Sequence, residues 1–544
     1  MAEDVALSAE VTEEAARRSS VTVRSIAIGA ALIPLTCMWV IQVEILWYSS
    51  QPTTVSLMPH VVFILFFLTL ANLLVAKLLP SSELNPGELL TIYVMLSIGS
   101  VVCGHDSLEI LVPMISHGFW GATPESGWAD SFHQYLPRWA LLDNREVVRG
   151  FYEGGSSMYR PEIIAAWGRP MLLWATFVFA LITSLFMINS LLRKQWTENE
   201  KLSYPVIQIP LALTTKTKQV LSSRLLWYGF ALAAGIDLLN GLAHFYPAIP
   251  QIPIVHIDNL RTYLTERPWN AMGNVWFSLY PFAIGVCFFL PLDLAFSCWF
   301  FFIFWKLQRV AASAMGVQIP GFPFINDQTA GGYLALCLVA LWVSRKYLKD
   351  LFLHIFGLGP KLDESNEALP HRISALALLG CLVYVGIFLN QLGMRWEIVP
   401  LFIIIYLAIA VAIARMRAEL GPPAHDLHYA GPDRMMGRFF GYKWLGGPTL
   451  TALAMTWFFN RAYRGHAIAP SLEGFKLAQQ TRTSSRRMLA ALLIALALGI
   501  FGGFWSMLHV GYKHGMEASV IGPGHWFGYE PYRDLHGFLS SARM

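Results

Sequence analysis

The stretch "LLTIYVMLSIGSVVCGHDSLEILVP" (residues 89–113) begins with an apolar run of 15 residues, which ends where Gly104, His105, Asp106 and Glu109 follow. At about 1.5 Å per residue, a helix of that length is about 22 Å long. The hydrocarbon core of a bilayer is about 30 Å thick. The run is too short to cross a membrane alone, and it predicts a broken or half-length helix.

The composition of the whole chain is that of a membrane protein. Of its 544 residues, 55% are hydrophobic and 14% are charged, against about 25% charged in a soluble domain. Apolar runs at 25–48, 165–192, 373–392, 397–414 and 488–511 reach or approach the length of about 20 residues that spans a bilayer. We therefore expect an all-α polytopic integral membrane protein with roughly 10–14 transmembrane helices, some of them broken or re-entrant, and an inverted repeat.

The positions of Lys and Arg at the ends of the apolar runs predict the topology, because cytoplasmic loops are enriched in these residues. The N-terminal tail 1–24 is expected in the cytoplasm, followed by a transmembrane domain at 25–511 and an external tail at 512–544. The same rule predicts external caps near 116–163 and 247–273, and cytoplasmic loops near 193–223, 346–372, 415–443 and 461–487.

Three further segments interrupt the pattern of simple crossings. The run 275–305 is too long for one upright helix and has Pro291 and Asp293 at its middle, whereas 309–345 and 430–465 each hold one apolar run between flanks of the same predicted side. Interrupted helices point to transporter binding sites near the membrane midplane. A transporter would bring the breaks at Gly104 and Pro291 together around one polar cavity.

Ionisable residues inside apolar segments are costly and usually face a cavity or a partner. On a helix, Asp237, Asn240, Gly241 and His244 share one face, which we expect to point inward. Such residues can bind a substrate or coupling ion, or can act as structural polar contacts between helices. The substrate or coupling-ion candidates are His105, Asp106, Glu109, Asp237, His244 and Asp293.

The stretch "RAELGPPAHDLHYAGPDR" (417–434) follows an apolar run and combines prolines and glycines with His425, Asp426 and His428. The prolines and glycines indicate a specified, non-helical loop. We expect a cytoplasmic gate or a structural packing element. Two histidines and an aspartate can ligate zinc, but no further ligands occur at a recognised spacing, so neither a metal nor a cofactor is predicted.

Five motifs carry a resemblance to known proteins: "LNPGELLTIYVML" (84–96), "QWTENEKLSYPVIQIPLAL" (195–213), "PFAIGVCFFLPLDLAFSCWFF" (281–301), "RAELGPPAHDLHYAGPD" (417–433) and "WFFNRAYRGHAIAPSLEGFKLA" (457–478). They resemble an uncharacterised family of bacterial and archaeal polytopic proteins. That family is distantly similar to the oligopeptide transporter superfamily, which moves peptides or metal chelates. Residues 85–87 are similar to an NPG motif of that superfamily, whereas its KIPPR-type motif is absent. The resemblance implies broken helices and leaves peptide substrates open.

The leading functional prediction is a secondary transporter of a small solute, peptide-like or metal-chelate-like and proton- or cation-coupled. The alternative is a scaffold subunit of a larger membrane complex, and the third is a lipid-linked glycan enzyme with Arg138, Arg145 or Arg149 lining its cavity. The chain lacks GxSxG, Walker A and HExxH motifs, so an enzyme is not expected.

The expected partners are membrane lipid and a small-molecule substrate, with homo-oligomers or complex partners left open and nucleic acid not expected. The expected location is the cytoplasmic membrane of a prokaryote.

Overall fold

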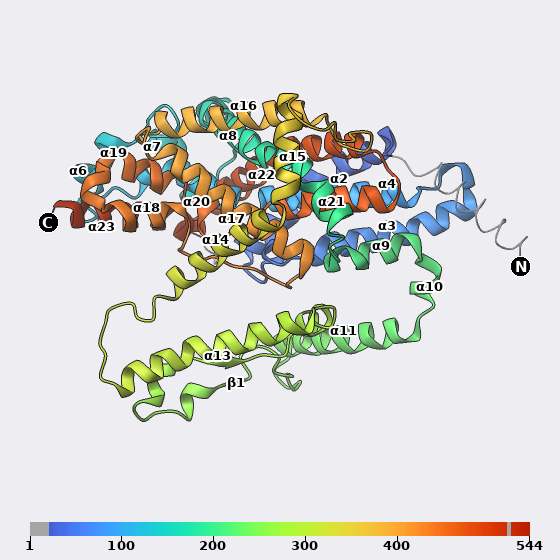
Figure 1. Cartoon of the computed structure of the whole chain (residues 1–544). Helices are drawn as coiled ribbons and strands as arrows, with labels where there is room; N and C mark the ends of the chain where they lie inside the picture. The colour runs from blue at the N-terminus through green and yellow to red at the C-terminus, as the bar shows by residue number, and fades with distance from the viewer. Residues whose placement is uncertain (1–20, 519–523, 544) are drawn as a thin grey trace, which may run out of the picture.

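The computed structural model describes residues 21–518 and 524–543, which fold mainly as α-helices (Figure 1). Most of the predicted N-terminal tail 1–24, and residues 519–523 and 544 of the predicted C-terminal tail, lie outside the described residues. The first helices are α2 (Val23–Ile41), α3 (Pro59–Leu78), α4 (Pro86–Cys103), α5 (Leu108–Trp120), α6 (Trp128–Phe132), α7 (Arg145–Glu153), α8 (Pro161–Lys194), α9 (Gln208–Thr215) and α10 (Thr217–Leu221).

The rest of the chain continues the helical pattern, with one small strand pair. The next elements are α11 (Arg224–Phe245), β1 (Asp258–Asn259), β2 (Trp276–Phe277), α12 (Pro281–Cys287), α13 (Leu292–Ala314), α14 (Ile325–Val343), α15 (Arg345–Phe356) and α16 (His371–Gln391). The last are α17 (Val399–Glu419), α18 (Pro432–Phe440), α19 (Tyr442–Met455), α20 (Trp457–Asn460), α21 (Ile468–Gln480), α22 (Ser485–His514) and α23 (Gly524–Arg543).

Nine helices of the described chain are long and apolar enough to cross a membrane. Most of the apolar surface of α3 is exposed, as expected for a helix that faces lipid. The prediction of an all-α polytopic membrane protein is confirmed.

Helix α4 lies at the centre of the main bundle. Every residue from Gly87 to Cys103 is buried, and a helix that is apolar on all sides must be surrounded by others. Helices α2 and α22 pack on α4 and on each other, and α21 packs on both α4 and α22. The start of α4 is a capping box, in which the Asn85 side chain accepts from the Glu88 N–H and Glu88 accepts from the Asn85 N–H. This local role accounts for the Asn-Pro-Gly sequence at 85–87.

The segment from α11 to α13 stands apart from the main bundle (Figure 1). Helix α11 has no buried residue, and α13 exposes most of its apolar side chains. The prediction that the face of Asp237 and His244 points inward is wrong, because both side chains are exposed and no other described helix packs closely against α11. Helical periodicity places these residues on one face but does not say what that face meets.

The segment 430–465 contains no helix of spanning length. Helix α19 has 14 residues, about 21 Å at helical rise, and is kinked at Gly446; α20 has only four. Residues 524–543 form α23, which packs on α5 and α19 and is therefore part of the bundle. The prediction of a tail at 512–544 is wrong in this respect, because α23 buries apolar residues such as Phe527 and Leu535.

A close approach of α22 to α4 depends on glycine. A Cβ atom at Gly499 would lie 2.9 Å from the Cα atom of Gly99, and small residues allow this packing in membranes. We expect Gly499→Ala to destabilise the protein by about 1–3 kcal/mol, as overpacking does, and to lower the melting temperature of the protein in detergent. Gly235→Ala on α11, where nothing lies within 4 Å of the new Cβ, is the matched control. Equal melting temperatures of the two variants would contradict this packing.

Candidate functional site

The chain between α4 and α5 is not helical. Gly104 is extended, with φ −83° and ψ −164°, and Ser107 has φ −150° and ψ −109°. A Cβ atom at Gly104 would lie 2.5 Å from Thr53 Oγ1, so the loop that carries Thr53 can approach only a glycine. The predicted break after Cys103 is therefore present, and we call residues 104–107 the first break.

A second break separates α20 from α21. Residues 461–467 are non-helical, and Tyr463 has the left-handed φ of +63°. Helix α21 packs on α4, whereas α20 packs on α5. Since the chain runs from α4 to α5 and from α20 to α21, the two broken helices cross in antiparallel directions at their breaks.

Asp106 joins the two breaks. Its Oδ2 accepts from the backbone N–H of Arg464 at 2.8 Å and of Gly465 at 3.4 Å. The Arg464 Nε lies 3.4 Å from Oδ2, and the Arg461 Nη1 lies 3.8 Å from Oδ1. The carboxylate stands at the N-terminal end of α5 and the arginines follow the C-terminal end of α20, as the dipoles of the two helix ends favour.

His105 and Glu109 lie on the other side of the first break with Glu44. Glu44 belongs to a π-helical turn, Gln42–Leu46, that follows α2. One ligand atom each of Glu44, His105 and Glu109 lies within 4.8 Å of the others, and all three side chains are buried. The His105 backbone N–H donates to Thr53 Oγ1 at 3.2 Å. The sequence therefore located His105, Asp106 and Glu109 correctly as neighbours at a break, and the structure adds Glu44.

The loop at 420–431 lies against the second break. The Leu427 N–H donates to Ala462 O at 2.9 Å, and the Tyr429 N–H donates to Arg461 O at 3.0 Å. His425 is buried, and burial lowers its pKa to about 3, so it packs as a neutral ring. Asp426 is exposed and His428 is half-buried. The loop holds a definite shape through backbone pairing.

A small cavity of about 30 Å³ adjoins Asp106. It lies among α8, α17 and the second break, and its walls are mostly apolar. His466 lines it and contacts the Tyr406 hydroxyl, with 3.1 Å between Nε2 and the oxygen. Burial lowers the pKa of His466 to about 3, so this ring is also neutral. The crossing of the two breaks is thus closed to all but very small molecules.

Asp237 and His244 belong to α11 and Asp293 belongs to α13, outside this cluster. All three side chains are exposed. Asp293 is in the first turn of α13, where a carboxylate stabilises a helix N-terminus. The break at Pro291 is present between α12 and α13. The prediction that it meets the break at Gly104 is wrong, because the first break meets residues 461–467.

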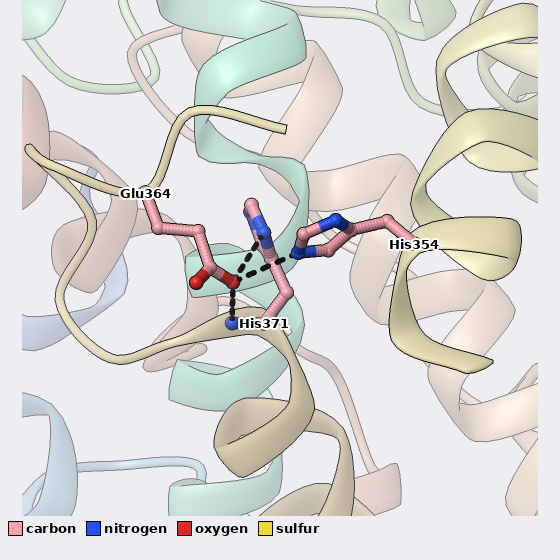
Figure 2. Close-up of side chains that lie close together, drawn as sticks. All are labelled: His354, Glu364 and His371. Carbon is pink, nitrogen blue, oxygen red and sulfur yellow. Dashed lines mark hydrogen bonds and ion pairs between the residues drawn. The ribbon is translucent and has the colours of Figure 1, made fainter. Parts of the chain in front are cut away.

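A second cluster of histidines and a carboxylate lies where α15 is joined to α16 (Figure 2). Glu364 Oε1 lies 3.1 Å from His354 Nε2 and 3.0 Å from His371 Nδ1. The same oxygen accepts from the His371 backbone N–H at 2.7 Å. We call these three residues the Glu364 clamp, since they join the loop 357–370 to both helices.

The hydrogen bonds of the Glu364 clamp favour a structural role over a metal site. His354 Nδ1 accepts from the Leu362 N–H at 3.1 Å, so in a neutral ring the proton is on Nε2, facing Glu364. A metal would need a lone pair at that nitrogen. Burial alone would raise the pKa of Glu364, but the bonds from His371 and His354 hold it below its usual value of 4.5.

The sequence reasoning missed the partners of Asp106. The positive-inside rule places Arg461 and Arg464 in the predicted cytoplasmic loop 461–487, but their side chains are only 10% and 18% exposed and contact Asp106. The small residues and tyrosine around them in "NRAYRGHAIAP" (460–470) were the available signal of a non-helical segment. The Glu364 clamp was also missed, because its residues are separated by 7 and 10 positions in the chain.

The fold and this cluster define a class: an all-α polytopic membrane protein with two broken helices that cross at a buried ion-pair network. The chain belongs to the family described as "Family of unknown function (DUF6785)", which matches residues 15–544. No curated protein and no solved structure gives a significant match.

The Glu364 clamp yields a pH-dependent prediction. A carboxyl group whose pKa is lowered by folding stabilises the fold above its unfolded pKa, and this contribution is lost as the pH falls through the folded pKa. We expect Glu364→Gln to destabilise the protein by about 1 kcal/mol at pH 7. The difference in melting temperature from the wild type should shrink below pH 4.5, the usual value.

Melting temperatures of detergent-solubilised protein between about pH 3 and pH 8, a range that extends below the usual Glu pKa, would measure this contribution. The control is Glu162→Gln, whose side chain is 57% exposed and should have little effect. A difference for Glu364→Gln that grows as the pH falls would contradict the assignment.

Proposed function

We propose that this protein is a secondary transporter of a small polar solute, and that the solute binds where the two breaks cross. The proposed location is the cytoplasmic membrane of a prokaryote, with the N-terminus in the cytoplasm. The main support for this proposal is the position of Asp106. This buried carboxylate belongs to one broken helix and accepts hydrogen bonds from backbone N–H groups of the other. Discontinuous helices that meet in this way build the substrate and ion sites of many transporters.

Charge supports a solute with a carboxylate or another anionic group. Arg461 and Arg464 both face Asp106, so two guanidinium groups share one carboxylate. Guanidinium groups bind carboxylates in bidentate geometry. If a solute carboxylate replaced Asp106 as the partner of one arginine, both Arg461 and Arg464 would still be paired with a carboxylate. Peptide-like solutes and metal chelates of carboxylates have this chemistry, in keeping with the resemblance to oligopeptide transporters.

The small cavity beside Asp106 supports a closed state of the transporter. A cavity of about 30 Å³ has room for about one water molecule, so a solute needs the crossing to open. The backbone of the second break is held by the 420–431 loop through Leu427 and Tyr429. Movement of that loop would release the segment that binds Asp106, which supports the predicted role of residues 425–428 as a gate.

The transporter proposal predicts different outcomes for two aspartates. In proteoliposomes, a panel of di- and tripeptides and of metal–carboxylate chelates would be tested for uptake by solid-supported membrane electrometry. We expect Asp106→Asn to reduce uptake at least tenfold, because the amide cannot balance Arg461 and Arg464. Asp293→Asn, the matched control on an exposed helix end, should keep wild-type uptake.

Two results would count against this proposal, the first against the site at Asp106 and the second against transport itself. One is wild-type uptake by the Asp106→Asn variant. The other is no uptake of any solute class by the wild type, together with a stoichiometric partner protein after gentle detergent extraction. The second result would favour the scaffold alternative, for which the outlying apolar α11 to α13 segment would be the natural binding surface.

A further inference from the structure

Two buried glutamates face each other beside the first break. Glu44 and Glu109 both have side chains with 0% exposure. Their carboxyl oxygens and a nitrogen of His105 lie within 4.8 Å of one another. Two carboxylates this close in a buried site repel each other strongly, so a proton or another cation must accompany them.

The two glutamates differ in their partners. Glu44 Oε1 accepts from the Thr53 N–H at 2.7 Å, and its Oε2 accepts from the Thr53 hydroxyl at 2.9 Å. Neither oxygen of Glu109 has a hydrogen-bond partner within the described chain. A buried ionised carboxylate without a donor is very costly. A protonated Glu109 is neutral and can turn its O–H toward Glu44, so the proton belongs on Glu109.

The contacts of His105 argue against a metal ion at this position. His105 Nε2 lies 3.4 Å from Arg461 Nη1, and a guanidinium group only donates. The lone pair of the ring therefore faces Arg461 at Nε2, and the proton is on Nδ1. His105 Nδ1 lies 3.6 Å from Glu109 Oε2, so the nitrogen that faces the glutamates carries a proton and cannot ligate a metal.

The charge balance of the crossing also favours a single proton. With every group ionised, Glu44, Glu109 and Asp106 exceed Arg461 and Arg464 by one negative charge. One proton makes the buried cluster neutral, whereas a divalent ion would leave it positive. The other titratable groups around the pair are Asp106 and His105 on the first break and Cys103 on α4, and His428 in the 420–431 loop interacts with His105.

We infer that Glu44 and Glu109 share one proton and that this proton is the coupling ion of the transporter. The second half of the inference rests on the proposed function. When the proton is bound, it is on Glu109. When the proton leaves, Glu44 and Glu109 are both ionised, and the buried cluster has one excess negative charge. Arg461 contacts both His105 and Asp106, so the excess charge would draw Arg461 toward the glutamates and weaken its contact with Asp106. Proton release thereby loosens the crossing.

Infrared difference spectroscopy of the full chain in lipid nanodiscs tests the shared proton directly. The carbonyl stretch of a protonated carboxyl group is separate from that of a carboxylate. At neutral pH we expect a band that corresponds to one protonated carboxyl group per chain, that disappears at alkaline pH and that is missing in Glu109→Gln. Glu44→Gln should shift the band, and the exposed-site control Glu146→Gln should leave it unchanged. Circular dichroism and size-exclusion profiles would confirm that each variant folds.

Three results would overturn the shared proton. They are the absence of the band in the wild type at neutral pH, a band that persists in folded Glu109→Gln, and one divalent metal ion per chain, by elemental analysis, that the variant loses. A further result would also overturn it: if the band appears only when sodium is absent from the buffer, Na⁺ and not a proton occupies the site under ordinary conditions.

Uptake measurements separate this inference from the proposed function. If the band is present and no solute is transported, the proton site stands and transport fails. If solute is transported at the same rate with and without a pH gradient, transport stands and coupling by this proton fails. The expected result is at least tenfold stimulation of uptake by the gradient in the wild type, and none in Glu109→Gln.

Discussion

The hydrogen bonds from the backbone of the second break to Asp106 are the constraint on which the centre of the molecule depends. Helices that break inside a bundle expose N–H and C=O groups that lipid cannot satisfy. Asp106 accepts the N–H groups of Arg464 and Gly465, so the polar side chain of one break satisfies the backbone of the other. The second break therefore needs the first, and α21 packs on α4.

The loop at 420–431 extends the same arrangement. Its backbone pairs with residues 461 and 462, and the Pro423 carbonyl accepts from the Ser56 N–H at 2.8 Å. Arg417, at the end of α17, forms a buried ion pair with Glu473 of α21 at 2.8 Å. The prolines, glycines and histidines after α17 are thus explained by a chain that must run in a fixed path between two helix breaks. Shape, and not flexibility, is what this sequence specifies.

Sequence reasoning located one half of the candidate site and not the other. The short apolar run before Gly104 predicted the first break, because its length and its polar ending are local properties. The partner could not be predicted in this way: Arg461 and Arg464 follow an apolar run, as cytoplasmic charges do. Asp237 and His244 show the converse, since a polar helical face looks the same whether it meets a cavity or remains exposed. Contacts with distant parts of the chain determine whether these arginines are buried and whether Asp237 and His244 are exposed.

The two histidine and glutamate clusters show why residue type alone does not define a site. Each combines histidine and glutamate within ligand distance. In the Glu364 clamp, the His371 backbone N–H and His354 Nε2 both donate to one carboxyl oxygen, and His371 Nδ1 lies 3.0 Å from it. These contacts stabilise an ionised glutamate. Within the part of the chain that the structure describes, Glu109 accepts no hydrogen bond, and the Thr53 donors are used by Glu44. The positions of the hydrogen-bond donors therefore favour an ionised, structural Glu364, whereas Glu109 needs a proton.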